Sequence, residues 1–348
     1  MKMNRILSIG IGLLIAVMSQ AQGKRMAVVE TSACYMRIAP DYESALETQE
    51  LMGTVVEIVG ENGYWREIVS PQPYKAWATE KTLVEMSEEQ IKEYEKAPKY
   101  IFTELYGHLY MEPAEKAQTI CDLVGGDMMR ISLKETDAGR GQTDPEGRKV
   151  KAAKPVTRCG WAQVILPSGK IGWVQKNTVR PLEERIDIRM GDTSSRLICN
   201  EKMEAIIASA HQLLGVPYLW GGMTSKGVDC SGLVRISAIM NGVLLPRNAS
   251  QMIKCGTAID VPPLLIAENG LPANASDRVK NLKRGDLVFF GTPATAEKPM
   301  RVTHVGIYLG NSRIIHSSHK VRVNSLNPDD SDYYENAHRL IAACRLAN

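Results

Sequence analysis

Hydrophobic and polar positions follow two different periods along the chain, and the change falls near residue 187. Before it, apolar and polar residues alternate in short runs such as 54–59 and 65–69. Turn residues separate these runs, including Glu-Asn-Gly at 61–63 and Ser-Pro at 70–71. Alternation interrupted by turns predicts short antiparallel strands, of the kind that build small all-β barrels.

An internal repeat divides this first region. In both copies two tryptophans lie twelve residues apart, and each copy has a leucine and a glycine ahead of its central strand. These landmarks are Trp65, Trp77, Leu51 and Gly53 in the first copy, and Trp161, Trp173, Leu123 and Gly125 in the second. Two copies are too few for a solenoid and predict two consecutive domains, at 26–86 and 99–182. The pattern resembles bacterial SH3-like domains, and a pair of generic barrels with tryptophan cores is the alternative.

Three connecting segments have a different composition. The charged residues 87–96 predict a short helix, because Ser87 and Gln90 make a capping box at its start. An insertion at 134–158 is rich in Gly, Lys, Asp and Pro and predicts an exposed loop. A second insertion at 261–281 also predicts a surface loop, and such a long loop can border a cleft.

Beyond residue 187 the apolar residues recur at helical spacing and then in short strand-like runs. The predicted helices cover 197–214 and 231–240, and the predicted strands cover 287–290, 305–309 and 313–316. Helices first and strands second predict an α+β domain, which we place at 187–348.

The first residues predict an export signal. Lys2 and Arg5 precede an apolar run at 6–17, and Ala21 supplies a small residue at the cleavage site. Twelve apolar residues fall short of the roughly 20 that span a bilayer. We therefore expect a signal peptide at 1–21 and a periplasmic or extracellular location. A lipid anchor is not expected, because no cysteine follows the apolar run.

Composition narrows the function further. A net charge of +3 without any run of five like charges argues against a nucleic-acid partner. The seven cysteines contain no CxxC pair, so a zinc ribbon is not expected, and no metal or cofactor is predicted. In an exported protein an odd number leaves at least one thiol unpaired, as a buried structural cysteine or as a reactive one.

Cys230 is the cysteine best placed for chemistry. It directly precedes the predicted helix at 231–240, and a helix N-terminus favours a thiolate. The N–H groups there can also receive an oxyanion, and Gly222 and Gly232 let a substrate approach the backbone. The sequence therefore makes Cys230 a candidate nucleophile.

His304 and His316 can supply the base that such a nucleophile needs. They lie twelve residues apart with a Gly-Asn turn at 310–311, so antiparallel strands can bring them together. One could then act as the base while the other orients it. Taken singly, each histidine fits a structural role better than a catalytic one.

Five motifs in a fixed order resemble the NlpC-type cell-wall peptidases, a circularly permuted branch of the papain-like cysteine peptidases. They are YLWGG at 218–222, DCSGLV at 229–234, LPR at 245–247, RGDLVFF at 284–290 and THVGIYLG at 303–310. The resemblance covers about 197–346. It implies that Cys230 is the nucleophile, His304 the base and His316 the third polar residue. His319 is a weaker candidate for that third role, because it lies past the predicted strand. The predicted fold is thus α+β, with a papain-like (NlpC-type) catalytic domain after two small all-β SH3-like barrels.

A signal, two SH3-like domains and a catalytic domain together resemble γ-D-glutamyl-L-diamino-acid endopeptidases, also called dipeptidyl-peptidase VI. That likeness implies release of L-Ala-γ-D-Glu from murein peptides with a free N-terminal L-Ala. The bond cut would join γ-D-Glu to L-Lys or diaminopimelate. The implied substrate-binding residues are Tyr218, Asp229, Ser231, Glu47, Tyr74 and Ser250.

Charge supports the implied preference for a free amine. Asp229 and Glu47 can pair with an ammonium, and a first domain that closes the cleft would exclude longer chains. The alternative for Asp229 is an N-cap of the catalytic helix, and both roles can hold together. For Trp220 we expect core packing. Asn248 departs from the family pattern, which often has aspartate there.

Two other functions remain open from the sequence. One is a cell-wall endopeptidase with another bond specificity, and the other is a non-catalytic wall-binding protein. The intact set of Cys230, His304 and His316 argues against the second.

Overall fold

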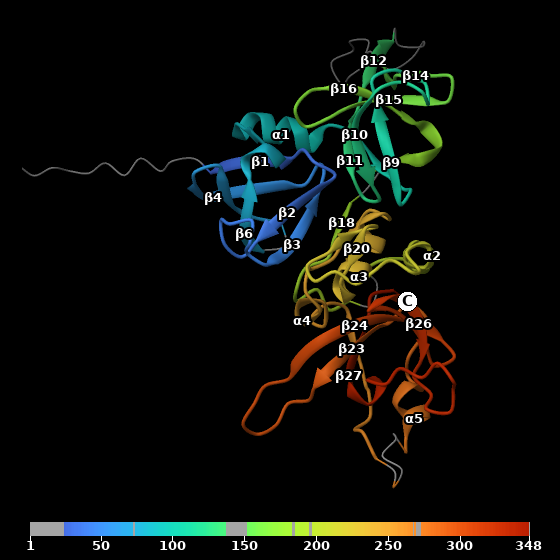
Figure 1. Cartoon of the computed structure of the whole chain (residues 1–348). Coiled ribbons are helices and arrows are strands. Elements are labelled where there is room, and N and C mark those ends of the chain that lie inside the picture. Colours follow the sequence, from blue (N-terminus) through green and yellow to red (C-terminus); the bar gives the residue numbers. More distant parts are fainter. Residues whose placement is uncertain are drawn as a thin grey trace, which may run out of the picture.

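The computed structural model describes residues 24–71, 74–136, 152–182, 185–194, 197–266, 268 and 273–347. The predicted signal peptide at 1–21 lies outside the described residues. In the described part, two all-β units come first and an α+β domain follows (Figure 1). No described helix is long and apolar enough to cross a membrane.

The first unit is a seven-stranded antiparallel sheet in the order β3-β2-β6-β5-β4-β1-β7. Its strands are β1 (Arg25–Val29), β2 (Ala33–Arg37), β3 (Leu46–Leu51), β4 (Val55–Asn62), β5 (Trp65–Val69), β6 (Lys75–Thr79) and β7 (Leu83–Met86). Alternate residues such as Val56, Ile58 and Ile68 fill its core, as the period of two predicts. Helix α1 (Glu88–Lys96) follows with the predicted capping box at Ser87, so the short helix is confirmed.

The second unit is an eight-stranded sheet with the main order β10-β9-β16-β15-β11-β8-β17 and with β14 paired to β15. Its strands are β8 (Lys99–Phe102), β9 (Tyr106–Tyr110), β10 (Thr119–Val124), β11 (Met128–Ile131), β14 (Thr157–Arg158), β15 (Trp161–Ile165), β16 (Ile171–Gln175) and β17 (Val179–Pro181). The repeat is visible in the register, because Trp77 lies opposite Glu67 and Trp173 lies opposite Gln163. The SH3-like character of both units stays a prediction.

Both insertions contain more regular structure than the sequence predicts. In the first, β12 (Leu133–Thr136) pairs with β13 (Ala152–Pro155), so the expectation of a loop throughout 134–158 is wrong in part. Residues 137–151 lie outside the described ones. In the second, helix α5 (Ala275–Val279) buries Arg278, whose guanidinium donates to the carbonyl oxygen of Pro262. A buried arginine with backbone partners explains why this part is not a plain surface loop.

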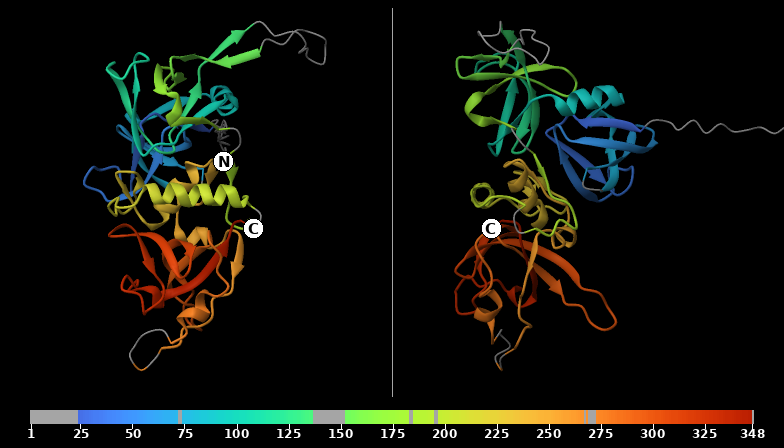
Figure 2. Two further views of the ribbon diagram at one scale, coloured as in Figure 1. Left: turned by 90° about the vertical axis from the view of Figure 1, so that its right-hand side faces the viewer. Right: turned by 180° about the vertical axis from the view of Figure 1, so that it is seen from behind.

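The third part places a layer of helices against a six-stranded sheet in the order β22-β27-β23-β24-β25-β26. Its main elements are α2 (Asn200–Gln212), α3 (Cys230–Ile239), α4 (Ala249–Met252), β22 (Thr257–Ile259), β23 (Leu287–Thr292), β24 (Arg301–Gly310), β25 (Arg313–Ser318), β26 (Lys320–Ser325) and β27 (Leu340–Arg345). Four short strands complete it: β18 (Ile186–Asp187) with β21 (Val243–Leu244), and β19 (Met223–Thr224) with β20 (Gly227–Val228). The predicted order of helices and strands is confirmed. In Figure 2 the helices lie between the two β units and this sheet.

One hydrophobic cluster joins all three parts. Leu51 of the first unit, Met128 of the second and Ile239 of helix α3 belong to it and are buried. The backbone N–H of Met128 donates to the carbonyl of Met52 at 3.0 Å, and Gly53 adopts a φ of 86° where a Cβ would meet the Met128 backbone. The turns that follow the repeated leucines therefore pack against each other and against the C-terminal end of α3. This junction fixes strand β3 beside helix α3.

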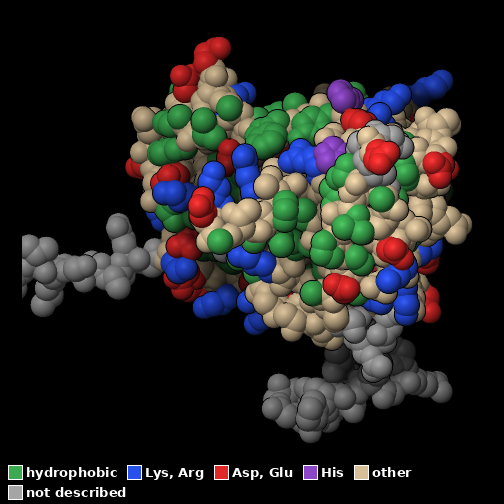
Figure 3. Space-filling view, turned by 90° about the horizontal axis from the view of Figure 1, so that it is seen from below, with side chains coloured by type: hydrophobic (Ala, Val, Ile, Leu, Met, Phe, Trp, Pro, Cys, Tyr) green, Lys and Arg blue, Asp and Glu red, His purple; other side chains and the backbone are tan. Residues whose placement is uncertain are grey.

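On the face of the molecule seen from below, neither sign of charge dominates among the described residues (Figure 3). In Figure 3 acidic, basic and hydrophobic side chains are interspersed over the visible side of the molecule. This agrees with the small net charge of +3.

Candidate active site

Cys230 begins helix α3, as the sequence predicts. Asp229 is its N-cap, and its Oδ1 accepts the N–H of Gly232 at 2.6 Å. The Cys230 side chain is nearly buried, with 8% of its surface exposed. Gly232 must be glycine, because a Cβ there would lie 2.1 Å from the carbonyl oxygen of Gly222. Both predicted glycines therefore allow the loop at 217–222 to pack against the helix start.

His304 and His316 lie side by side on β24 and β25. Nε2 of His304 is 2.8 Å from Nδ1 of His316. His316 is fully buried, and the ring of Tyr334 packs edge-on against it at 4.5 Å between centroids. The predicted neighbourhood of the two histidines is confirmed. Burial lowers the pKa of both histidines, and the mutual approach of the rings and nearby Arg322 lower that of His304 further.

Burial changes the pKa of the Cys230 thiol more than the helix start does. Burial, followed by the negative charge of Asp229, raises its pKa to about 11. The N–H groups of Val305 on β24 and of Ser231 at the helix start lower it, but they do not outweigh burial. The helix start thus favours the thiolate, whereas burial favours the neutral thiol.

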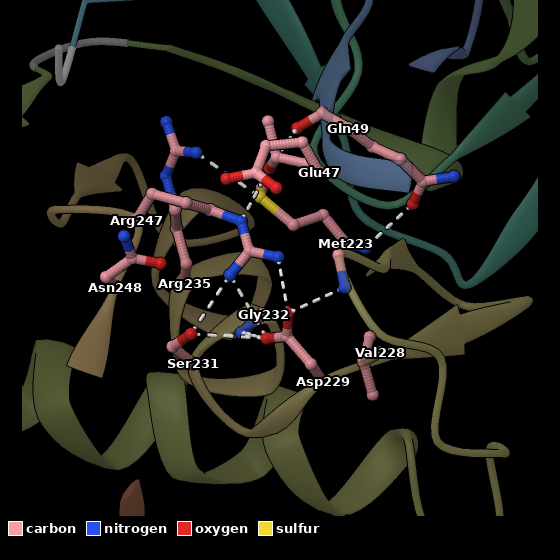
Figure 4. Close-up of polar contacts among 12 residues, drawn as sticks. Glu47, Gln49, Met223, Val228, Asp229, Ser231, Gly232, Arg235, Arg247 and Asn248 are labelled. Carbon is pink, nitrogen blue, oxygen red and sulfur yellow. Dashed lines mark hydrogen bonds and ion pairs between the residues drawn. The ribbon is translucent and has the colours of Figure 1, made fainter. Parts of the chain in front are cut away.

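Arg247 neutralises Asp229. Its Nη2 lies 2.6 Å from Oδ2 and its Nη1 lies 3.1 Å from Oδ1, and Nη1 also donates to Oγ of Ser231 at 2.9 Å. Oδ2 of Asp229 additionally accepts the N–H of Gly221 at 3.0 Å. Figure 4 shows Arg247 reaching toward Asp229 and Ser231 at the start of α3. The N-cap role of Asp229 is confirmed, and its carboxylate is fully engaged within the protein.

Three consecutive residues of strand β3 in the first unit contact the segment around Cys230. Oγ1 of Thr48 accepts Nε of Arg247 at 2.6 Å, and Oε1 of Gln49 accepts the N–H of Met223 at 2.8 Å. Glu50 pairs with Arg235 of α3 at 3.2 Å in a setting where both are buried. The first unit is thus part of the site and not an independent appendage.

Glu47 and Tyr74 meet at the edge of the same strand. The hydroxyl of Tyr74 donates to Oε1 of Glu47 at 2.8 Å. The backbone of Glu47 packs so closely on Gly221 that a Cβ at Gly221 would lie 3.0 Å from it. The structure therefore brings both residues to the loop that precedes Cys230, as the family resemblance implied. Among described residues, none pairs with Oε2 of Glu47.

Tyr218 and Ser231 lie at the start of the catalytic segment. The backbone N–H of Tyr218 donates to the carbonyl of His319 at 2.8 Å. Tyr218 also forms a β-bridge with Val228, two residues before Cys230. Burial, followed by the charges of Cys230 and Asp229, raises the pKa of its phenol to about 12. Ser231 is buried and donates to Oδ1 of Asp229 at 3.2 Å. Both predicted residues therefore belong to the surroundings of Cys230.

Three sequence expectations fare differently. Ser250 is exposed on α4, and no hydrogen bond described around Cys230 involves it, so the structure does not bring it into the site. His319 is exposed with a φ of 62°, so it holds Tyr218 through its backbone and is not the partner of His304. Trp220 is 68% exposed, so the expectation of core packing is wrong. Trp220 directly precedes Gly221, which packs closely on Glu47.

Fold and site together define a papain-like cysteine peptidase: a cysteine at a helix start faces a sheet that carries a paired histidine. Residues 215–340 match the NlpC/P60 family. The site also contains three residues to which the sequence assigned no role, namely Arg247, Thr48 and Asn324, whose Oδ1 lies 3.0 Å from Nε2 of His316. Only Arg247 had a signal, as the last residue of the LPR motif.

Curated relatives agree with this assignment. The chain is 25% identical over 297 residues to a protein of Bacillus cereus named gamma-D-glutamyl-L-lysine dipeptidyl-peptidase, covering 83% of this chain and 72% of the relative. It is 23% identical over 321 residues to dipeptidyl-peptidase 6 of Lysinibacillus sphaericus, covering 91% and 97%. The crystal structure of an NlpC/P60 family protein from Bacillus cereus covers 92% of this chain and 99% of its own, with 19% identity and a TM-score of 0.62, which supports the fold.

Proposed function

We propose that this cysteine peptidase hydrolyses murein peptides between γ-D-Glu and the L-diamino acid, and that it releases L-Ala-γ-D-Glu from peptides with a free N-terminal L-Ala. The names of the two relatives support this reading. The observation that carries it is the Glu47–Tyr74 pair, which the first unit places against the loop before Cys230.

The pair suits recognition of an ammonium. Oε1 of Glu47 is oriented by Tyr74, and the carboxylate is only partly exposed. A charge-assisted hydrogen bond to a positive amine is stronger there than one between neutral groups. An N-acylated peptide has no such charge and also needs space that the first unit fills. Asp229 contributes indirectly, because Arg247 already balances its charge.

Chemistry then follows the usual order of acyl transfer. Sγ of Cys230 attacks the γ-carbonyl carbon of D-Glu while its proton moves to His304. N–H groups at the start of α3 stabilise the oxyanion. His304 returns the proton to the amine of the departing diamino acid, which leaves a thioester on Cys230. Water, deprotonated by His304, attacks the thioester and releases the dipeptide and the thiol.

Two paired substrates test the proposal. L-Ala-γ-D-Glu-L-Lys with a free N-terminus should be cleaved, and its N-acetylated form should be cleaved at least about tenfold more slowly, because it lacks the ammonium. Cys230→Ala is the control for both substrates. Equal cleavage of both substrates would contradict the dipeptidyl-peptidase activity. Cleavage that persists in Cys230→Ala would show that Cys230 is not the nucleophile.

The proposal extends to location and domain organisation. An exported protein with two SH3-like units at 26–86 and 99–182 and a catalytic domain at 187–348 would meet its substrate outside the cytoplasm. Secretion assays with and without residues 1–21 test this part separately from catalysis.

A further inference from the structure

Asn324 on β26 extends the histidine pair to a third side chain. Its Oδ1 lies 3.0 Å from Nε2 of His316. Its Nδ2 lies 2.7 Å from the backbone carbonyl oxygen of Asp332. Asn324 is 7% exposed and His316 is fully buried, so water does not compete freely for either contact. The chain of contacts therefore runs from a backbone carbonyl to His304.

The donor and the acceptor of each hydrogen bond follow from the bond between Asn324 and the Asp332 carbonyl. The carbonyl of Asp332 can only accept, so the amide nitrogen of Asn324 faces it and the amide oxygen faces His316. An amide oxygen can only accept, so Nε2 of His316 carries a proton. A neutral His316 then has its lone pair on Nδ1, which accepts from Nε2–H of His304. His304 is left with its lone pair on Nδ1.

We propose that Asn324 is a positioning residue that sets the tautomers of His316 and His304, so that Nδ1 of His304 is the atom that takes the thiol proton of Cys230. The inference rests on the proposed roles of Cys230 and His304. In the step concerned, the S–H bond of Cys230 breaks, its proton goes to Nδ1 of His304, and the sulfur electron pair forms the bond to the carbonyl carbon. Without Asn324 the opposite tautomer would place N–H groups on both Nδ1 atoms, and His304 could not accept the proton.

An amide suits this position differently from a carboxylate. It fixes the hydrogen-bond direction without adding a negative charge, so it raises the pKa of His316 only through the hydrogen bond. A carboxylate in its place would still accept from Nε2 of His316 but would favour the imidazolium. Asn324→Leu and Asn324→Asp therefore separate control of the tautomer from control of the charge.

The loop that carries Asp332 offers a matched control. Arg313 binds the two carboxylate oxygens of Asp332 at 3.0 and 2.7 Å. Arg313→Gln removes this tether but leaves the Asp332 backbone carbonyl available. It reports how much of any effect comes from loosening the loop alone.

The primary experiment measures alkylation of Cys230 by iodoacetamide, followed by peptide mass spectrometry, in the full chain. This readout needs no wall peptide, so it can fail or succeed independently of the proposed function. We expect Asn324→Leu to lower the alkylation rate at neutral pH by about 10- to 100-fold. In a cleavage assay, kcat should fall by about 10- to 100-fold while KM changes little. We expect Arg313→Gln to stay within about twofold of the native rate. In Asn324→Asp the rate should recover in part, with its acid limb moved to higher pH.

A measurement on the native protein guards against a variant that fails to fold. Nitrogen-15 NMR of labelled histidine should show a proton on Nε2 and none on Nδ1 of His304 in the neutral resting protein. A proton on Nδ1 of His304 would overturn the proposal. So would a folded Asn324→Leu protein that keeps the native rate and pH profile.

Discussion

The guanidinium of Arg247 lies against both carboxylate oxygens of Asp229, with Nη2 2.6 Å from Oδ2 and Nη1 3.1 Å from Oδ1. Both side chains are largely removed from solvent. Asp229 also accepts two backbone N–H groups, from Gly221 and Gly232. A carboxylate has about four lone-pair positions, so little capacity remains for a substrate amine. Under the proposed function, we therefore expect Glu47 and not Asp229 to pair with the amine.

Glu47→Gln should weaken selection for a free amine. We expect kcat/KM for the free tripeptide to fall by about tenfold or more, because a charged hydrogen bond becomes a neutral one. Activity on the acetylated tripeptide should change little. Glu43→Gln, on an exposed part of the same unit, is the control and should leave both values unchanged. If Glu47→Gln prefers the free tripeptide over the acetylated one as strongly as the native protein does, the amine binds elsewhere.

Arg247→Met should damage both folding and catalysis. It leaves the buried carboxylate of Asp229 without its counter-ion, and breaking such a pair costs about 3–5 kcal/mol. Urea unfolding measures the loss, and activity at low temperature shows whether the folded fraction still works. Arg247→Lys should rescue part of the stability, because lysine keeps the charge but not the fork geometry. Native stability in Arg247→Met would show that the pair is not needed.

Glu50→Gln should loosen the first unit from the catalytic helix. Arg235 is fully buried, and its Nε and Nη2 have no hydrogen-bond partner among the described atoms. Removing the charge of Glu50 should therefore cost about 3 kcal/mol in the free energy of unfolding. In a double-mutant cycle, Glu50→Leu with Arg235→Met should cost less than the sum of the two single changes. Strict additivity would mean that the two residues do not interact energetically.

The acid limb of catalysis should lie below the ordinary pKa of histidine. His304 must be neutral to accept the thiol proton, and burial lowers its pKa. A lowered pKa keeps the ring neutral at every pH above it, so kcat should hold as pH falls through about 6.5 and decline only at lower pH. A kcat profile from pH 4 to 9 checks this. An inflection near 6.5 would indicate a histidine exposed to water.

An alkaline limb should appear in kcat/KM because of the substrate. The α-amine of a peptide loses its proton at about pH 7.7–8.0, and the neutral amine no longer pairs with Glu47. Free tripeptide should therefore show a fall in kcat/KM above about pH 8. The acetylated tripeptide has no such group and serves as the control. The same fall with both substrates would trace it to the enzyme.

Much of the architecture could be predicted from local patterns. A period of two located the strands of both β units, and helical spacing located α2 and α3 within a few residues. The motif around Cys230 and the turn between His304 and His316 identified the candidate site, because each depends on neighbours in the chain or on one hairpin. The same logic failed for Trp220, because exposure depends on what packs around a residue.

What only the tertiary structure decided is the set of contacts between distant segments. Glu50 and Arg235 are 185 residues apart, and Thr48 and Arg247 are 199 apart. No periodicity links such positions. The shared core of Leu51, Met128 and Ile239 brings them together by excluding water from apolar surface. The sequence by itself determined the nucleophile candidate and its elements, whereas packing of the first unit decided which charges remain free to meet a substrate.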